Sequence, residues 1–298
     1  MRRATRLKHR LADRAPLLDA RSHHPHMDLC TLGHIARTDQ LSALGYTRAR
    51  LARAVADGSV RRLRRGTYVC VHLDGPLLVA ARMGGAITCV SVLREHDVWA
   101  GHDRRVHVQL SPHASTTVPP GVRVHRELAR FGGSALRVSP LQALWQAMRC
   151  LDGENAIAAM ESAIHKGFLT EEQVRRLGVL APRRLQGGIR QLSTTSESGN
   201  ETIVRLRLVA VGYRVEPHGH VPGLGHQDLV VEDCVGLEVD SEAWHGQDQA
   251  EEDVRRDLVS EGLGRHVLRI RPDDIHQRWP STLAVIDRMV RDALLLRH

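Results

Sequence analysis

Alternating apolar and polar residues predict a two-stranded hairpin across residues 225–245, and this is the most informative pattern in the chain. Leu229 and Val231 fall on one face of its first strand, and Leu237 and Val239 fall on one face of its second. We therefore expect one apolar face, buried against a core, and one polar face.

The polar face of this predicted hairpin carries three carboxylates. A turn centred near Asp233 sets Asp228 directly opposite Glu238, with Cβ atoms about 5 Å apart, and Asp240 follows on the same face. Like charges placed opposite one another are destabilising unless a cation neutralises them. Clusters of oxygen ligands suit Mg²⁺ or Mn²⁺. A solvated strand face, or acids paired with arginines, is the alternative reading without a metal.

Residues 28–75 contain a second pattern, two short helices followed by a strand hairpin. Gly45 ends the first helix and Thr47 begins the second, whose Leu51 and Val55 point inward. This is the element order of a winged helix-turn-helix that binds DNA, although basic surfaces are also common in a chain so rich in arginine. The candidate DNA contacts on the second helix and the hairpin are Arg48, Arg50, Arg53, Arg61, Arg62, Arg64 and Arg65.

The remaining segments are less specific. Strands are expected at 106–110 and 122–126 among several helices, with no chemical constellation between them. The predicted layout is a basic tail at 1–27, the DNA-binding domain at 28–75, a mixed α/β connector at 76–180, a linker at 181–195 and a final domain at 196–298.

The final domain opens with a helix capped by Ser198. Glu201 lies three positions on, where it completes a capping box. It also lies in line with Val204 and Leu208, on the inward stripe of the helix. Both a capping role and a role in an acidic site remain open for Glu201.

The composition favours one class of partner and argues against zinc motifs and membrane helices. The net charge of +8 and the pI of about 9.9 favour an anionic partner, nucleic acid first. The five cysteines form no CxxC or other zinc spacing, and the histidines form no clear metal signature. The odd number of cysteines also argues against a disulfide framework, so a protein of the reducing cytoplasm is expected. No stretch reaches the roughly 20 apolar residues of a membrane helix.

The segment LSALGYTRARLARAVADGSVRRLRRGTYV, from Leu41 to Val69, resembles the winged-helix domain of antitoxins from type IV, AbiEi-like, abortive-infection systems. The first helix of that domain is represented only by residues 35–38. The resemblance implies DNA binding and a cognate toxin as a partner.

The segments SGNETIVRL, GLGHQDLVVEDCVGLEVDSEAWHG, DVRRDLVSEG, HVLRI and DDI, in chain order, resemble a nuclease-like domain related to very-short-patch repair endonucleases, of the PD-(D/E)XK fold. The resemblance implies a mixed sheet flanked by helices, with acids on central strands. By position, Asp228 and Glu238 would be the first and second acids. Asp240 stands where the motif has lysine, and no lysine follows Lys166.

In this reading Asp228, Glu238 and Asp240 hold Mg²⁺ or Mn²⁺, and Glu201 assists. His245 is a candidate proton acceptor that is otherwise a surface histidine. Arg256 is a candidate for stabilising charge on the phosphate, or a partner for a neighbouring aspartate.

The sequence thus predicts a multidomain α+β or α/β protein that binds DNA. One hypothesis makes it a magnesium-dependent DNA endonuclease in phage defence or repair. The alternative is a non-catalytic, antitoxin-like transcriptional regulator whose degenerate nuclease fold serves as a binding or homodimer platform.

Overall fold

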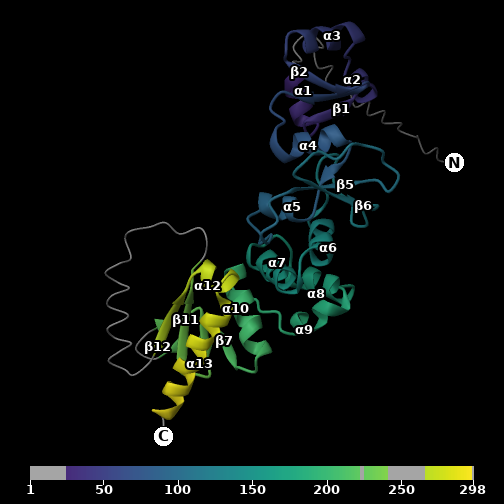
Figure 1. Ribbon diagram of the computed structural model, residues 1–298. Coiled ribbons are helices and arrows are strands. Elements are labelled where there is room, and N and C mark those ends of the chain that lie inside the picture. The colour runs from purple at the N-terminus through teal and green to yellow at the C-terminus, as the bar shows by residue number, and fades with distance from the viewer. Residues whose placement is uncertain (1–24, 222–224, 241–265, 297–298) are drawn as a thin grey trace, which may run out of the picture. The chain divides into compact units, whose positions relative to one another are not determined.

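A computed structural model describes residues 25–221, 225–240 and 266–296 (Figure 1). The chain divides into two compact units, Met1–Gly75 and Pro76–His298. Both units contain helices and small antiparallel or mixed sheets, which confirms the mixed α and β character that the sequence predicted. None of the helices in the described ranges is long and apolar enough to cross a membrane.

The first unit is built around a three-stranded antiparallel sheet of order β1-β3-β2. Its described elements are α1 (Pro25–Thr31), β1 (Ile35–Arg37), α2 (Thr38–Ala43), α3 (Arg48–Ala56), β2 (Val60–Arg64) and β3 (Thr67–Cys70). Gly45 follows α2 with φ +85°, a conformation that glycine adopts without strain, so α2 ends where the sequence predicted. The predicted basic tail lies largely outside the described residues.

The second unit begins with helices around a small sheet of order β4-β5-β6, in which β5 and β6 run parallel. Its elements up to residue 189 are α4 (Gly75–Met83), β4 (Ala86–Ile87), α5 (Val90–Glu95), β5 (Val106–Leu110), β6 (Val122–Arg126), α6 (Pro140–Cys150), α7 (Gly153–His165), α8 (Glu171–Val179), η1 (Arg183–Leu185) and α9 (Gln186–Ile189). Apolar residues of these elements form the larger hydrophobic core.

The segment predicted as a linker, 181–195, contains η1 and α9 and packs against this core. Leu185 is buried there. Gly188 lies so close to α7 that an added Cβ would stand 2.6 Å from Ile157 Cγ1. This glycine therefore permits close packing of the backbone, and the segment is part of the domain and not the predicted linker.

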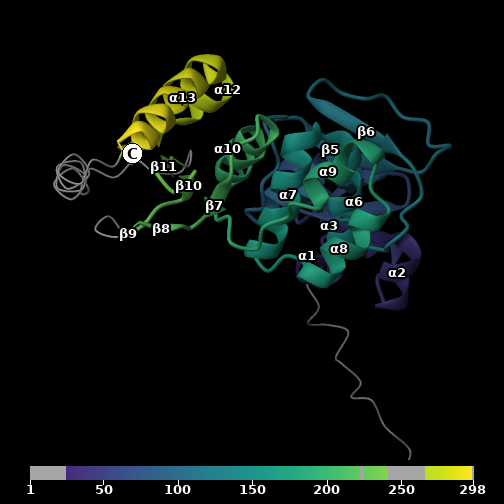
Figure 2. The ribbon, with the colours of Figure 1, turned by 90° about the horizontal axis from the view of Figure 1, so that it is seen from below.

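The C-terminal part has its own core and a four-stranded sheet of order β12-β11-β10-β7, in which only β11 and β12 are parallel. Its described elements are α10 (Gly199–Ala210), β7 (Val215–Pro217), β8 (His220–Val221), β9 (Gly225–His226), β10 (Leu229–Val231), β11 (Val235–Val239), β12 (His266–Ile270), α12 (Pro272–His276) and α13 (Trp279–Leu295). Figure 2 shows α12 and α13 together beside the strands, and both contribute to the same core as α10. Residues 247–261, whose charged sequence predicts a helix, lie outside the described residues.

Candidate nucleic-acid interface and acidic site

Helix α3 presents a basic side to solvent. The Thr47 side chain caps it by accepting a hydrogen bond from the backbone N–H three residues on, at 3.2 Å. Leu51 and Ala54 are buried, which fixes the inward face. Arg48 and Arg53 are exposed, as predicted for contacts with DNA.

Arg50, the third predicted arginine of α3, lies differently. It is half-buried, and its guanidinium carbon lies 4.6 Å from the centre of the Tyr46 ring. The Tyr46 hydroxyl in turn donates to the Asp28 carboxylate, and burial together with this hydrogen bond raises the pKa of Tyr46. Arg50 is thus held against the core of the first unit.

The hairpin of β2 and β3 carries the remaining predicted arginines. Arg62, Arg64 and Arg65 are exposed. Arg61 is half-buried and donates to backbone carbonyls after β3, including that of Val71 at 3.1 Å. Its guanidinium is occupied in closing the hairpin, so its expected role as a phosphate contact gives way to a structural one.

The acidic hairpin has the register that the sequence predicted. Leu229 pairs with Leu237 and Val231 pairs with Val235, so the turn is centred on Asp233. Continuing this register by one residue sets Asp228 opposite Glu238. The apolar face, including Leu229 and Leu237, lies in the C-terminal core as predicted. The opposite face is not wholly polar, because Val230 is also buried there, beside Val267.

Asp228 and Asp240 are each held by hydrogen bonds. Asp228 is half-buried, and its Oδ2 accepts a hydrogen bond from the Val239 N–H at 2.7 Å. Asp240 Oδ1 accepts from Arg269 Nε at 2.8 Å. The backbone carbonyl of Asp240 also accepts from the Asn200 side-chain amide at 3.1 Å, which joins β11 to the start of α10.

Glu201 faces inward at the start of α10, but it does not complete the predicted capping box, because its carboxylate accepts from the N–H of Glu197 and not from that of Ser198. Its backbone N–H donates to the Ser198 hydroxyl at 3.1 Å, so Ser198 is the predicted cap of α10. Its carboxylate faces inward, is buried, and accepts from the Glu197 N–H at 3.0 Å. Burial raises the pKa of Glu201, and the negative charge of nearby Asp228 raises it further. Burial likewise raises the pKa of Asp228.

His218 belongs to the same group and was missed by sequence reasoning. Its Nε2 lies 3.9 Å from carboxylate oxygens of both Glu197 and Glu201. That nitrogen is buried and makes no hydrogen bond within the described part of the chain. The residue has φ +50°, unusual for a non-glycine residue. His218 follows a short strand, so no hydrophobic periodicity in the sequence singled it out.

As they lie, the hairpin acids do not form a ready coordination shell. Among the described residues, two groups of three or more potential ligands have donor atoms within 4.8 Å of one another, and neither includes Asp228, Glu238 or Asp240. Asp240 is held by Arg269 instead. The two other predicted catalytic residues, His245 and Arg256, lie outside the described residues.

A basic helix beside a basic hairpin is typical of DNA-binding proteins. Residues 32–71, which contain both, match a family model described as "Transcriptional regulator, AbiEi antitoxin". The match supports a role as a DNA-binding regulator and bears out the resemblance found in this part of the sequence. None of the curated proteins compared with the chain matches it.

Proposed function

We propose that the protein is a DNA-binding transcriptional regulator of the antitoxin type, with residues 28–75 as a winged helix-turn-helix. The observation that carries the proposal is the basic side of α3, within the segment similar to AbiEi antitoxins. Arg48 and Arg53 enter a major groove, and Arg62, Arg64 and Arg65 follow the phosphate backbone. The first pair reads bases, and the hairpin adds affinity that depends little on sequence.

The test is fluorescence anisotropy with duplexes from the DNA upstream of the protein's own gene, at several salt concentrations. Phosphate contacts make affinity fall with salt, so the logarithm of the affinity should decline linearly with that of salt concentration. A double variant, Arg48→Ala with Arg53→Ala, should lose binding to the specific duplex. Light scattering on the same samples reports whether a homodimer binds.

A matched control comes from α8, where Arg175 and Arg176 are exposed and pair with Glu171 and Glu172. Replacing both arginines by alanine removes the same formal charge as the α3 double variant. Wild-type affinity in this control, with loss in the α3 variant, supports the proposal. Equal losses in the two variants contradict it, because net charge alone would then account for binding.

The antitoxin type of regulator implies a cognate toxin. Repression of a promoter shared with a toxin gene is the expected arrangement, and rescue of growth on co-expression with that toxin is the expected result. Toxicity unaffected by the protein would restrict the proposal to transcriptional regulation.

A second candidate function is metal-dependent cleavage of DNA by the C-terminal domain. Its support is the resemblance to repair endonucleases, together with Asp228 and Glu201, two partly or wholly buried acids with raised pKa. Arg269 holds Asp240 Oδ1, so a Mg²⁺ or Mn²⁺ ion would bind the other carboxylate oxygen or displace the arginine.

Cleavage is tested on plasmid and single-stranded DNA with Mg²⁺ or Mn²⁺. Asp228→Ala is the decisive variant, and Glu172→Ala, at an exposed acid of α8, is its control. Metal-dependent cleavage lost only in Asp228→Ala supports this candidate. Cleavage equal in wild type and Asp228→Ala assigns the activity to a contaminant.

A further inference from the structure

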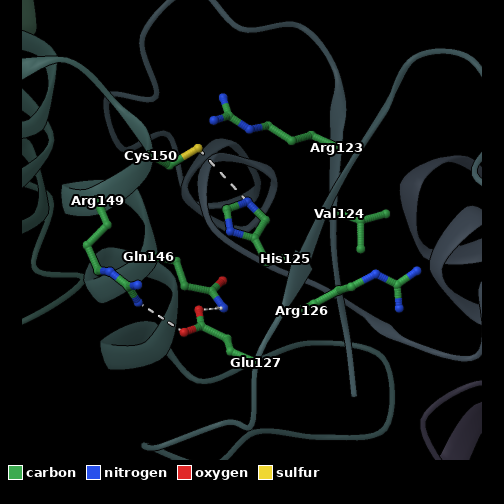
Figure 3. A pocket seen from close by; sticks show the side chains of 8 residues that line it. All are labelled: Arg123, Val124, His125, Arg126, Glu127, Gln146, Arg149 and Cys150. Carbon is green, nitrogen blue, oxygen red and sulfur yellow. Dashed lines mark hydrogen bonds and ion pairs between the residues drawn. The ribbon is translucent and has the colours of Figure 1, made fainter. Parts of the chain in front are cut away.

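Four cysteine and histidine side chains meet in the first part of the second unit. They are Cys89, His107, His125 and Cys150, and one donor atom from each lies within 4.8 Å of all the others. Each comes from a different element: Cys89 precedes α5, His107 is on β5, His125 is on β6, and Cys150 ends α6. Figure 3 shows His125 and Cys150 facing one another.

The spacing of these donor atoms suits a tetrahedral ion. His107 Nδ1 lies 3.1 Å from His125 Nε2, and Cys150 Sγ lies 3.8 Å and 4.0 Å from the same two nitrogens. A zinc shell with Zn–N of about 2.0–2.1 Å and Zn–S of about 2.3 Å has N–N edges of roughly 3.4 Å and N–S edges of roughly 3.6 Å. These three groups are thus within a few tenths of an ångström of coordination geometry, and the Cys89 donor atom lies within 4.8 Å of each of them.

Asp103 orients one of the imidazoles. Its Oδ2 lies 3.1 Å from His107 Nε2, the ring nitrogen that points away from the cluster. Arg105 Nε and a second guanidinium nitrogen hold the Asp103 carboxylate at 2.9 Å and 2.7 Å. With the proton on Nε2 facing the carboxylate, His107 Nδ1 presents its lone pair to the cluster. A carboxylate behind a ligating histidine is the usual arrangement in zinc proteins.

The backbone at Cys89 is a second, independent sign. Cys89 has φ +51° and ψ −134°, although it is neither glycine nor asparagine, and its side chain is wholly buried. Such a conformation costs on the order of 1–3 kcal/mol and persists where the surroundings hold it in place. Here it turns the thiol toward the two histidines and Cys150.

We propose that Cys89, His107, His125 and Cys150 bind a structural Zn²⁺ ion. Two thiolates and two neutral imidazoles are a zinc donor set, and four protein ligands fill a tetrahedral shell and leave no open position for catalysis. The ion would fasten α5 and α6 to the parallel strands β5 and β6. None of these four residues belongs to the basic surface of the first unit or to the acidic site.

The site has a path to solvent. A pocket of about 320 Å³ opens beside β6 and α6, and His125 and Cys150 line it together with Arg123, Val124, Arg126, Glu127, Gln146 and Arg149 (Figure 3). Cys89 and His107 are buried behind them. An ion can therefore enter through the pocket and meet the two half-buried ligands first.

The proposal is tested by measuring the zinc content of the purified protein with elemental mass spectrometry. The wild type should hold zinc after dialysis, and Cys150→Ser and His125→Asn should each lose one equivalent per chain. Cys234→Ser is the matched control, because Cys234 is a buried cysteine of the C-terminal core, outside this cluster. Unchanged zinc content in Cys150→Ser and His125→Asn overturns the proposal.

A second set, Cys30, His34 and Cys70, lies in the first unit, and Cys30→Ser reports on it separately. Cobalt in place of zinc leaves all four proposed ligands unchanged, so this test does not depend on the folding of Cys150→Ser or His125→Asn. Tetrahedral Co²⁺ with thiolate charge-transfer absorption that survives in Cys30→Ser supports the site. Absence of that absorption in Cys30→Ser, or a Cys89–Cys150 disulfide in protein isolated without oxidation, overturns it.

Discussion

Arg205 and Glu161 form an ion pair in which the side chains are only 5% and 1% exposed. The pair joins α10 to α7. Thr202 also donates to the Glu161 carboxylate at 2.6 Å, the Ser193 N–H donates to it at 2.7 Å, and Arg205 donates to the Gln191 carbonyl at 2.9 Å. Both charges are therefore compensated inside the protein, as buried charges must be.

Removing one partner should be costly. Arg205→Met leaves the Glu161 carboxylate buried without its cation, and we expect a loss of about 3–5 kcal/mol in the free energy of unfolding. Arg175→Met, at an exposed pair on α8, should cost less than about 1 kcal/mol. Chemical denaturation followed by circular dichroism measures both. A loss below 1 kcal/mol for Arg205→Met would show that the pair is dispensable.

Arg61 should separate stability from DNA binding. Because its guanidinium donates to carbonyls after β3, Arg61→Ala should destabilise the first unit by about 1–3 kcal/mol. Arg62→Ala, at an exposed neighbour, should leave stability unchanged and lower the salt dependence of DNA binding by about 0.9 per lost phosphate contact. Thermal unfolding and anisotropy titrations distinguish the two. If Arg61→Ala and Arg62→Ala changed stability and DNA binding to the same extent, the two arginines would not have separate roles.

The pH dependence of stability should reflect Glu201. Its pKa is raised in the folded protein, so its contribution to stability is full below the unfolded pKa, about pH 4, and is lost as pH rises through the folded pKa. Glu201→Gln keeps an acceptor for the Glu197 N–H but cannot ionise. We expect the variant to be more stable than wild type at pH 7 and to lose that advantage near pH 4. Denaturation curves measured from pH 4 to pH 7 test this expectation. A stability difference between the two proteins that does not change with pH would contradict it.

Asp103 offers a graded test of the zinc site. Asp103→Asn keeps a side chain of the same shape but removes the charge behind His107. We expect zinc to bind with the same stoichiometry and with about 10–100-fold lower affinity. Competition with a chromophoric chelator measures the affinity. Asp273→Asn, at an exposed acid of α12, is the control, and an affinity equal to wild type in both variants would argue against a supporting role for Asp103.

Local patterns predicted local structure well and long-range assembly poorly. The strands at 106–110 and 122–126 have the predicted bounds. Thr170 caps α8 with a capping box, which is the local structure that the sequence TEEQ favours. The sequence of neither strand predicts that the two strands pair in parallel. This pairing brings His107 and His125 together. The zinc spacing sought in the sequence assumes ligands close along the chain, whereas Cys89 and Cys150 meet only through tertiary packing.

In the acidic hairpin, too, the local register could be predicted and the contacts with distant segments could not. Its register followed from alternation and the position of the turn, because a one-residue slip would bury the acids. The partner of Asp240 did not follow, since Arg269 reaches it from β12, a strand separated in sequence. His218 likewise joins Glu201 only once β7 has folded beside β10.

Helix α7 belongs to both cores of the second unit: Ile157 packs in the larger one, and its neighbour Ala158 packs in the C-terminal one. A fragment starting at residue 196 would leave the inner side of α10 facing water and would strip Arg205 of its anion. Gene fusions that borrow the C-terminal sheet must therefore also carry α7, or supply a helix that replaces it.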